Sequence, residues 1–295
     1  MPKLLTVPQP STEYVPHTRD HDTARGFLLY RGPSRLTGAP IIAVATQGRL
    51  CENRETGAMH TLWVMREDMS PLAAAYGAGR GADGAVCGDC PLGPGAAPED
   101  VANRLCFVAL HQAPLGVWRA FHRGNYPKLS HRAHRRLSSH SWRFCGYGDT
   151  AAVPLGVWEH ASRYTHGRDM GHTHMWKWEG AREYRTMAMA SCQTPQEADH
   201  ARALGWRAYL IGPEDAEVPQ RGAVGGPYMG CAKQREAATR LQCNECGGCG
   251  GTRGRDVVAA SVYANVHGTP LKGMNPRALF TDRYGADHSA ADGHG

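Results

Sequence analysis

Residues 185–212 (RTMAMASCQTPQEADHARALGWRAYLIG) constrain the fold of this chain more than any other segment. Residues 186–191 are short and mostly apolar, which predicts a buried strand. Residues 194–197 (TPQE) then have the types expected at a helix N-cap, a first helical position and a capping box. Gly205 supplies a left-handed stop, and residues 206–211 predict a second strand. Strand, helix and strand make a βαβ unit, whose two strands run parallel because the crossover is a helix.

Further strand-like segments precede and follow this unit. They lie at 41–46, 59–65, 106–110, 143–147, 172–176 and 257–264. With the two strands of the βαβ unit they number about eight, and the later ones alternate with helices, as in a (β/α) barrel. We therefore predict an α/β fold that is (β/α) barrel-like, irregular at its first strands, with a cysteine-rich metal-binding insertion before the last strand. An open doubly wound sheet is the alternative.

The pentapeptide Pro-Leu-Gly-Val-Trp occurs twice, at 114–118 and at 154–158. Each copy begins a segment with helical character, and each follows a strand-like segment that begins at or near a cysteine. The repeat predicts two successive βα units of one architecture.

The length of 295 residues and a hydrophobic content of 41% suit one large α/β domain. We expect an irregular N-terminal arm at 1–36, a single domain at 37–274 that contains the metal-binding insertion at 228–252, and a disordered tail at 275–295. The sequence has no apolar run of about 18 residues and no signal-peptide pattern, so we expect a cytoplasmic protein without a membrane partner.

Basic residues are concentrated in one connector, and the chain as a whole has a formal charge of +6. Residues 128–143 (KLSHRAHRRLSSHSWR) carry five Lys or Arg, three His and no acid. Cations on such a segment displace counterions from a nucleic-acid backbone. We expect phosphate contacts, on DNA rather than RNA, from Lys128, Arg132, Arg135 and Arg136. The alternative is a solvated connector.

Ten cysteines in a cytoplasmic chain favour metal binding over disulfides, because that compartment keeps thiols reduced. The first set consists of Cys231 and the C-x2-C-x2-C run Cys243, Cys246 and Cys249. Four thiolates close a tetrahedral zinc site, and His267 is an alternative fourth ligand. The same run is also typical of iron–sulfur ligation, so an iron–sulfur cluster is the alternative cofactor.

Cys87, Cys90 and Cys106 form the second candidate metal set. The first pair has the spacing of a metal knuckle, and Cys51 or a nearby His is a candidate fourth ligand. If three protein ligands bind, the fourth position is open for substrate or water, which is typical of catalytic metal sites. The alternative is that these cysteines are buried as small apolar residues.

Candidate catalytic side chains follow the predicted strands, where a parallel sheet carries its chemistry. Asp149 is a candidate nucleophile or general base, or a simple cap of the next turn. His172 and His174 share one strand face and suit acid–base work, metal ligation or ordinary packing. Trp176 suits stacking on a base or filling a core. The strand-end candidates are His111, Asp149, His174, Cys192, Asp215 and His267.

Short motifs spread over residues 40–270 occur together in this chain. They are 86–92 (VCGDCPL), 106–108 (CFV), 146–149 (GYGD) with 153–154 and 158, 173–176 (THMW), 189–191 (MAS), 205–207 (GWR), 243–249 and 267–268. Together they resemble an uncharacterised family of phage and plasmid proteins, whose name implies no activity.

Cys243, Cys246, Cys249 and His267 carry a more distant similarity to the tRNA-guanine transglycosylase superfamily, which includes phage enzymes that put 7-deazaguanines into DNA. Those proteins are (β/α) barrels with closely spaced zinc-binding cysteines and a later histidine, placed late in the chain. Their cysteines are spaced C-x-C-x2-C, where this chain has C-x2-C-x2-C. The second set, with Cys106-Phe107, is distantly similar to the cluster site of radical-SAM-like barrels, although their C-x3-C-x2-C motif is absent.

The resemblance and the basic connector lead to one functional hypothesis with two rivals. We predict a phage-type base-exchange transglycosylase that acts on guanine or 7-deazaguanine in DNA, in the host cytoplasm. Asp149 would attack the sugar carbon or stabilise charge on it, and His174 would act as acid or base. The base would stack on an aromatic ring such as Trp176, and His111 would also bind the substrate. The rivals are an iron–sulfur, radical-SAM-like enzyme that uses the Cys87 set and a zinc-stabilised nucleic-acid-binding protein without catalysis.

Overall fold

The fold is known from a computed structural model. It describes residues 24–48, 50, 56–77, 81–93, 105–106, 108–137, 140–165, 168–213, 228–234, 241–252 and 261–265. Among the described helices, none has the length and apolar character needed to cross a membrane.

Nine strands in the described ranges form two sheets. The first sheet has the order β1-β2-β3-β4, in which β1 to β3 pair antiparallel and β3 pairs parallel with β4. The second sheet has the order β5-β6-β7-β9-β8 and is entirely parallel. The strand bounds are β1 Gly26–Pro33, β2 Pro40–Thr46, β3 His60–Arg66, β4 Trp142–Tyr147, β5 His172–Thr173, β6 Met189–Cys192, β7 Ala208–Gly212, β8 Tyr228–Gly230 and β9 Ser261–Asn265.

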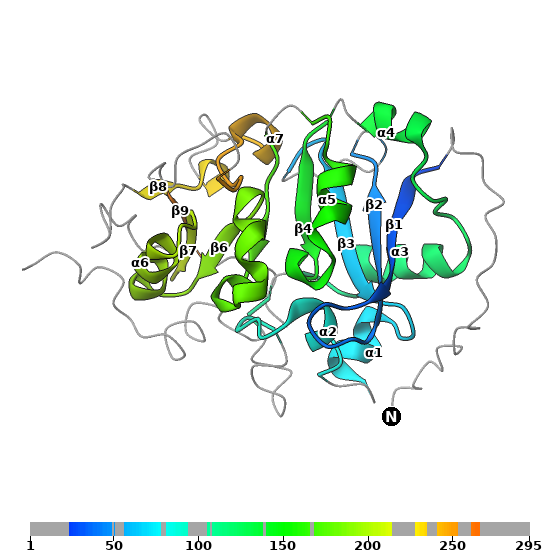
Figure 1. Ribbon diagram of the computed structural model, residues 1–295, viewed down its shortest axis with the longest axis horizontal. Coiled ribbons are helices and arrows are strands. Elements are labelled where there is room, and N and C mark those ends of the chain that lie inside the picture. The colour runs from blue at the N-terminus through cyan, green and yellow to red at the C-terminus, as the bar shows by residue number, and fades with distance from the viewer. Residues whose placement is uncertain are drawn as a thin grey trace, which may run out of the picture.

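A single parallel bridge between Arg143 and Met170 connects the two sheets. The Met170 N–H donates to the Trp142 carbonyl at 2.8 Å, and the Met170 carbonyl accepts from the Phe144 N–H at 2.8 Å. Met170 lies just before β5, so β5 follows β4 in the spatial order. The strands therefore succeed one another across the whole molecule, from β1 at one end to β8 at the other (Figure 1).

The structure confirms a mixed α/β fold, but it does not confirm the predicted (β/α) barrel. In the described part of the chain, β1 and β8 are the outer strands of their sheets, and no pairing closes the order into a barrel. The first strands explain part of the difference. β1, β2 and β3 are joined as antiparallel neighbours, and such neighbours need no crossover helix.

Short helices connect and cover the strands, and α5 lies over β4 in Figure 1. The α-helices are α1 Pro71–Tyr76, α2 Gly84–Cys87, α3 Ala113–His122, α4 His131–Leu137, α5 Leu155–Ala161, α6 Pro195–Ala203 and α7 Cys243–Cys246. The 3-10 helices are η3 Thr150–Ala152, η4 Met175–Lys177, η5 Glu179–Thr186 and η6 Ala232–Gln234.

The core on the α5 side of the sheet is built from large aromatic rings. Trp142 stacks on Phe144 with ring centroids 6.3 Å apart, and Trp158 of α5 meets Phe144 edge-on at the same separation. Both tryptophans are fully buried. Aromatic contacts of this kind add to the free energy that burial of the rings supplies.

The predicted βαβ unit is confirmed as β6-α6-β7, with parallel strands. The Thr194 hydroxyl accepts from the Glu197 N–H at 3.2 Å, and Pro195 opens α6. The Glu197 carboxylate accepts from the Gln193 N–H at 2.8 Å, one residue before the cap. Gly205 has a φ of +84°, as the predicted left-handed stop requires.

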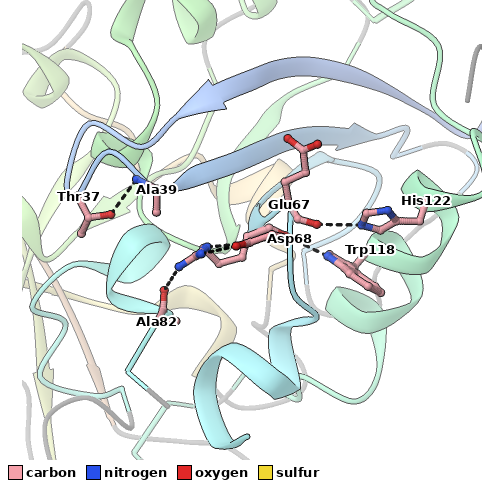
Figure 2. A network of polar contacts seen from close by, with 8 residues as sticks. Thr37, Ala39, Glu67, Asp68, Ala82, Trp118 and His122 are labelled. Atoms are coloured by element: carbon pink, nitrogen blue, oxygen red, sulfur yellow. Dashed lines mark hydrogen bonds and ion pairs between the residues drawn. The ribbon is translucent and has the colours of Figure 1, made fainter. Parts of the chain in front are cut away.

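Both copies of the repeated pentapeptide begin helices, α3 and α5, although only α5 follows a strand. The two tryptophans play equivalent parts. The Trp118 indole N–H donates to the Arg66 carbonyl at 3.0 Å, and the Trp158 indole N–H donates to the Thr150 carbonyl at 2.8 Å. Figure 2 shows that Trp118 and His122 attach α3 to the carbonyls of Arg66 and Glu67 at the end of β3. Asp68 and the Ala82 carbonyl accept from the Arg66 side chain.

Three predicted elements differ from the structure. The arm predicted at 1–36 contains β1, because its run FLLY at 27–30 is apolar enough to pair with β2. Residues 106–110 are not a strand where they are described. Instead Leu105 and Cys106 are held by Leu92, whose carbonyl accepts from the Cys106 N–H at 2.8 Å. The strand predicted at 172–176 ends at Thr173, because η4 begins at Met175.

Candidate functional site

Polar side chains gather where β4, β5 and β6 end, as the strand-end prediction proposed. Asp149 follows β4, His174 follows β5, and Gln193 follows β6. Hydrogen bonds join these positions directly, so the three strand ends form one constellation at the carboxyl edge of the parallel strands. This edge is where α/β sheets bind ligands.

The Asp149 carboxylate is buried and accepts hydrogen bonds on both oxygens. Oδ1 accepts from the Ala151 N–H at 2.9 Å and from the Thr173 hydroxyl at 2.8 Å. Oδ2 accepts from the His174 N–H at 2.9 Å. Burial raises the pKa of Asp149, and these hydrogen bonds oppose that rise. The carboxylate thus caps η3 and ties the end of β4 to the end of β5, as in the capping alternative.

His174 is a neutral imidazole in this constellation. Its Nε2 lies 3.2 Å from the Gln193 side-chain nitrogen. An amide nitrogen only donates, so with this amide orientation Nε2 of His174 accepts and its proton resides on Nδ1. Burial lowers the pKa of His174 to about 4. The ring is therefore uncharged at neutral pH, and its acceptor nitrogen Nε2 is occupied by the Gln193 amide.

Cys87, Cys90 and Cys106 lie at this same edge. The Asp149 N–H donates to the carbonyl of Val86 at 2.6 Å, which puts Cys87 beside the end of β4. Cys90 and Cys106 pack against the cluster that contains Ile211, near the end of β7. All three thiols are half-buried. The loop from α2 therefore passes over the carboxyl ends of the strands.

Burial and neighbouring charges make two of these thiols, Cys87 and Cys90, hard to ionise. Burial raises the pKa of Cys87 well above its ordinary value, and Cys90, Asp83, Cys106 and Asp149 raise it further. The pKa of Cys90 is raised by burial and then by Cys106. The three sulfur atoms thus lie within electrostatic reach of one another. A bound cation would reverse this balance, because a metal ion stabilises thiolates.

The loop that carries Cys243, Cys246 and Cys249 lies at the opposite edge of the parallel strands, whereas Cys231 directly follows β8. The Cys249 carbonyl accepts from the Gly171 N–H at 3.1 Å, just before β5, and the Asn244 N–H donates to the Thr56 carbonyl at 3.2 Å, ahead of β3. The Thr252 N–H donates to the Arg185 carbonyl, before β6. The two cysteine sets therefore lie at two separate places in the fold.

Four thiols of the second set line one cavity of about 20 Å³. They belong to Cys231, Cys243, Cys246 and Cys249. This volume is that of about one water-sized particle. As the side chains stand, no three His, Cys, Asp or Glu groups in the described residues are close enough together to hold a metal ion. Ligation would require side-chain rotation into the cavity.

The loop that carries these thiols is held firmly. Arg207 donates through Nη2 to the Gly248 carbonyl at 3.0 Å and through Nη1 to the Gly250 carbonyl. Arg143 and Lys233 lower the pKa of Cys243, but burial and Cys231 outweigh them and raise it to about 11. Both cations are well placed to offset the negative charge of a thiolate cluster.

Several predicted site residues lie elsewhere or have other roles. Trp176 is only 3% exposed and its indole N–H donates to the Ser191 carbonyl at 2.9 Å, so its ring is part of the core and not a stacking surface. Cys192 is buried, while His111, Lys128 and Arg135 are exposed. The remaining predictions concern residues or side chains outside the part of the chain that the structure describes: Cys51, Arg132, Arg136, Asp215 and His267.

Sequence reasoning missed Gln193, Thr173 and Arg207. Gln193 and Thr173 stand next to residues that were singled out, and the rule that polar side chains after parallel strands meet at one edge would have found Gln193. Arg207 precedes its strand, and nothing in the local pattern indicates that it reaches the cysteine loop.

Comparison with known proteins gives no relative for this chain. No family model matches it, and neither a curated protein nor a solved structure matches it.

Proposed function

We propose that this chain is an iron–sulfur enzyme whose cluster is held by Cys87, Cys90 and Cys106. One observation carries the proposal. The three thiols lie at the carboxyl edge, beside the Asp149–His174–Gln193 constellation, while the loop that carries Cys243, Cys246 and Cys249 bonds to backbone at the opposite edge. A ligand-binding edge with its own set of thiols is the arrangement that a catalytic cluster needs.

The spacing of the three thiols suits a cluster better than a single ion. No three ligand groups in the described ranges are close enough for one metal ion, yet these three thiols interact electrostatically. A cluster contains several irons, each with its own cysteine, so its thiolates stand farther apart than those around one ion. When bound, such a cluster would supply single electrons, and Cys87, Cys90 and Cys106 would hold it.

The residues beside the cluster would position the substrate and accept a proton from it. Asp149 fixes the ends of β4 and β5, so that His174 is presented at the edge. Gln193 sets the orientation of the neutral His174 ring through Nε2, so Nε2 would take up a proton only after Gln193 releases it. We assign Asp149 and Gln193 positioning roles and His174 the role of proton acceptor.

For the opposite edge we propose a structural zinc site. The cavity lined by Cys231, Cys243, Cys246 and Cys249 has room for one ion and not for a cluster. Its loop bonds to backbone before β3, β5 and β6, away from the ligand-binding edge. Closed four-cysteine sites of this kind stabilise folds and do not catalyse.

Base exchange on DNA is the second candidate function. The exposed cations Lys128 and Arg135 of the basic connector favour a nucleic-acid partner. The nucleophile that it requires, Asp149, has both oxygens occupied by hydrogen bonds. The substrate would therefore have to displace Thr173 or His174 before Asp149 could attack. For this reason we rank the iron–sulfur enzyme first.

The metal content of single-cysteine variants tests the proposal. We would purify the protein anaerobically, measure iron, sulfide and zinc, and record the visible spectrum. Cys87→Ala and Cys231→Ala are matched controls for each other. Cys87→Ala is expected to lose iron and absorbance near ~400 nm while it keeps zinc, and Cys231→Ala is expected to lose zinc while it keeps iron.

Each alternative outcome has a definite meaning. Zinc in both sets, without visible absorbance, would reject the cluster and return base exchange to first place. Iron that is lost in Cys231→Ala and kept in Cys87→Ala would show that the two sites were assigned the wrong way round. Wild-type protein without metal would reject both sites.

A further inference from the structure

A cavity of about 680 Å³ lies between β1, α5 and the segment that follows α3. Its lining residues come from three places, 28–31 of β1, 128–129, and 156–161 of α5. Neither cysteine set nor Asp149 contributes to it. Its volume lies within the range of about 300–1,000 Å³ that is typical of small-molecule sites.

The walls of this cavity are mostly apolar. Apolar side chains from all three segments line it, namely Leu28, Leu29, Leu129, Val157 and Ala161. The Tyr30 ring adds an aromatic surface, and its hydroxyl is held by the Pro33 carbonyl at 2.8 Å. An occupant would gain free energy by burying an apolar body against these side chains.

The charged groups of the lining are all basic. Arg31, Lys128 and the titratable His160 line the cavity, and no carboxylate does. Arg31 is already paired with Glu67, whose carboxylate lies 2.5 Å from its Nη2. Among the residues that the structure describes, Lys128 has no ion pair or side-chain hydrogen bond. The Lys128 ammonium is therefore the cation in the lining that can pair with a ligand.

We infer that this cavity binds an amphipathic anion, a small molecule with an apolar body and one carboxylate or a similar acid. The apolar body would lie between β1 and α5, and the acid would meet Lys128. A nucleic-acid strand fits less well, because it carries a charge at every phosphate and the cavity offers one unpaired cation and an apolar wall.

The repeated pentapeptide provides a matched pair of variants. Gly156 lines the cavity, and a Cβ at this position meets no heavy atom within 4 Å. Gly116 is the equivalent glycine of the first copy, is equally open, and does not line the cavity. Both glycines lie in helices, so a phenylalanine at either position causes no backbone strain. Only Gly156→Phe places a ring in the cavity.

The experiment measures displacement of a fluorescent naphthalenesulfonate dye by decanoate, with decan-1-ol as the uncharged comparison. Wild type and Gly116→Phe are expected to bind decanoate equally. Gly156→Phe is expected to weaken binding at least 10-fold. Lys128→Gln is expected to weaken decanoate several-fold and to leave decanol unchanged. Circular dichroism and the melting temperature establish that each variant is folded.

Three results would overturn the inference. The first is the absence of saturable decanoate binding by wild type. The second is equal binding by Gly156→Phe and Gly116→Phe, which would put the ligand elsewhere. The third is displacement of the dye by a short single-stranded DNA but not by decanoate, which would make this surface a nucleic-acid contact. If Gly156→Phe does not fold, Lys128→Gln tests the inference instead. An unchanged ratio of decanoate affinity to decanol affinity in Lys128→Gln would then overturn it.

Discussion

Asp149 is a buried carboxylate that stabilises the fold, although it lies at the carboxyl edge, where ligands bind. We expect Asp149→Asn to lower the free energy of unfolding by about 1–3 kcal/mol. The asparagine oxygen can replace Oδ1, but its amide group would face the His174 N–H, which is also a donor. Urea denaturation at pH 7 measures the change. Asp89→Asn, on the exposed neighbouring loop, is the control and is expected to be neutral within about 0.5 kcal/mol. A stable Asp149→Asn protein that has lost base-exchange activity would instead support the nucleophile hypothesis.

His60 is the second residue whose environment makes a measurable prediction. Its Nδ1 accepts from the Gly48 N–H at 3.1 Å, and its Nε2 lies 2.9 Å from the Leu137 carbonyl, so the proton resides on Nε2 and the ring is neutral. Burial and then the charge of His140 lower the pKa of His60 to about 4, against the opposing effect of the Leu137 hydrogen bond. A second proton, on Nδ1, would face the Gly48 N–H, which is also a donor.

This lowered pKa gives the pH dependence a definite sign. The unfolded chain takes up the His60 proton near pH 6.5 and the folded chain near pH 4, so stability from this group is complete above pH 6.5 and is lost as the pH falls to 4. We expect His60 to account for a loss on the order of 1–3 kcal/mol over this window. His60→Gln, which does not titrate, should show a shallower decline in denaturant titrations at pH 7, 5.5 and 4. Parallel curves for the two proteins would contradict the prediction.

At the scale of elements, two turns depend on glycines with nearly the same backbone conformation. Gly148 ends β4 with a φ of +81°, and Gly205 follows α6 with a φ of +84°. A Cβ at Gly148 would lie 2.7 Å from the Val64 carbonyl oxygen, whereas at Gly205 the nearest atom is Nη1 of Arg185 at 3.5 Å. The two sites therefore share backbone strain but differ in available space.

We expect Gly205→Ala to cost about 1–2 kcal/mol, the strain of a left-handed alanine. Gly148→Ala should cost at least about 1 kcal/mol more, because β3 has to move away from the new methyl group. Thermal or urea unfolding of the two variants measures the difference. Equal costs would mean that the end of β4 yields easily, which would also weaken the proposal that Asp149 is a rigid positioning residue.

The elements that sequence predicts well are those defined by local chemistry. Residues 194–197 determine where α6 begins, because a hydroxyl, a proline and a carboxylate satisfy the first turn by themselves. Residues 106–110 show the limit. Cys106 packs against the cluster of Leu92 and Ile211, Leu110 is buried in the main core, and none of the described residues of this range pairs with a strand. An apolar run of this length predicts burial, and distant partners decide whether it pairs.

The candidate site also has features that the sequence predicts and features that it does not. That Asp149 and His174 share an edge was predictable, because both follow parallel strands. Whether Asp149 has a free oxygen was not, because its partners Thr173 and His174 reach it only when β4 and β5 lie side by side. The burial of Trp176 likewise depends on its partner Ser191 in β6. The sequence thus predicts which side chains could take part in chemistry, but it does not predict whether a ligand can reach them.

At the scale of the whole molecule, strand order separates the two cysteine sets. The cysteine segment at 231–249 lies between β8 and β9 in sequence, and β9 pairs with both β7 and β8. This order carries the segment to the edge where the parallel strands begin. No feature of the sequence specifies which strand lies next to β9, and so spacing alone left open whether the two sets formed one site.

This placement predicts what removal of zinc does to the molecule. The loop at 241–252 bonds to backbone ahead of β3, β5 and β6 and to the side chain of Arg207 before β7, so it joins strands of both sheets. If a zinc ion closes this loop, a chelator should lower the melting temperature by about 5–10 °C. Cys243→Ser should melt at the lower temperature without chelator, because one thiolate ligand is missing. Differential scanning calorimetry with and without a zinc chelator measures both effects.

Cys90→Ser is the matched control, since Cys90 belongs to the set at the other edge. The chelator should lower the melting temperature of Cys90→Ser as much as that of wild type, and added zinc should restore both. A structural role for the zinc requires that Cys243→Ser gain nothing from added zinc. If the chelator leaves the wild-type melting temperature unchanged, hydrogen bonds such as those of Arg207 to Gly248 and Gly250 hold the loop without metal. The four thiols would then be ordinary buried cysteines, and the proposed zinc would be withdrawn without affecting the cluster at the carboxyl edge.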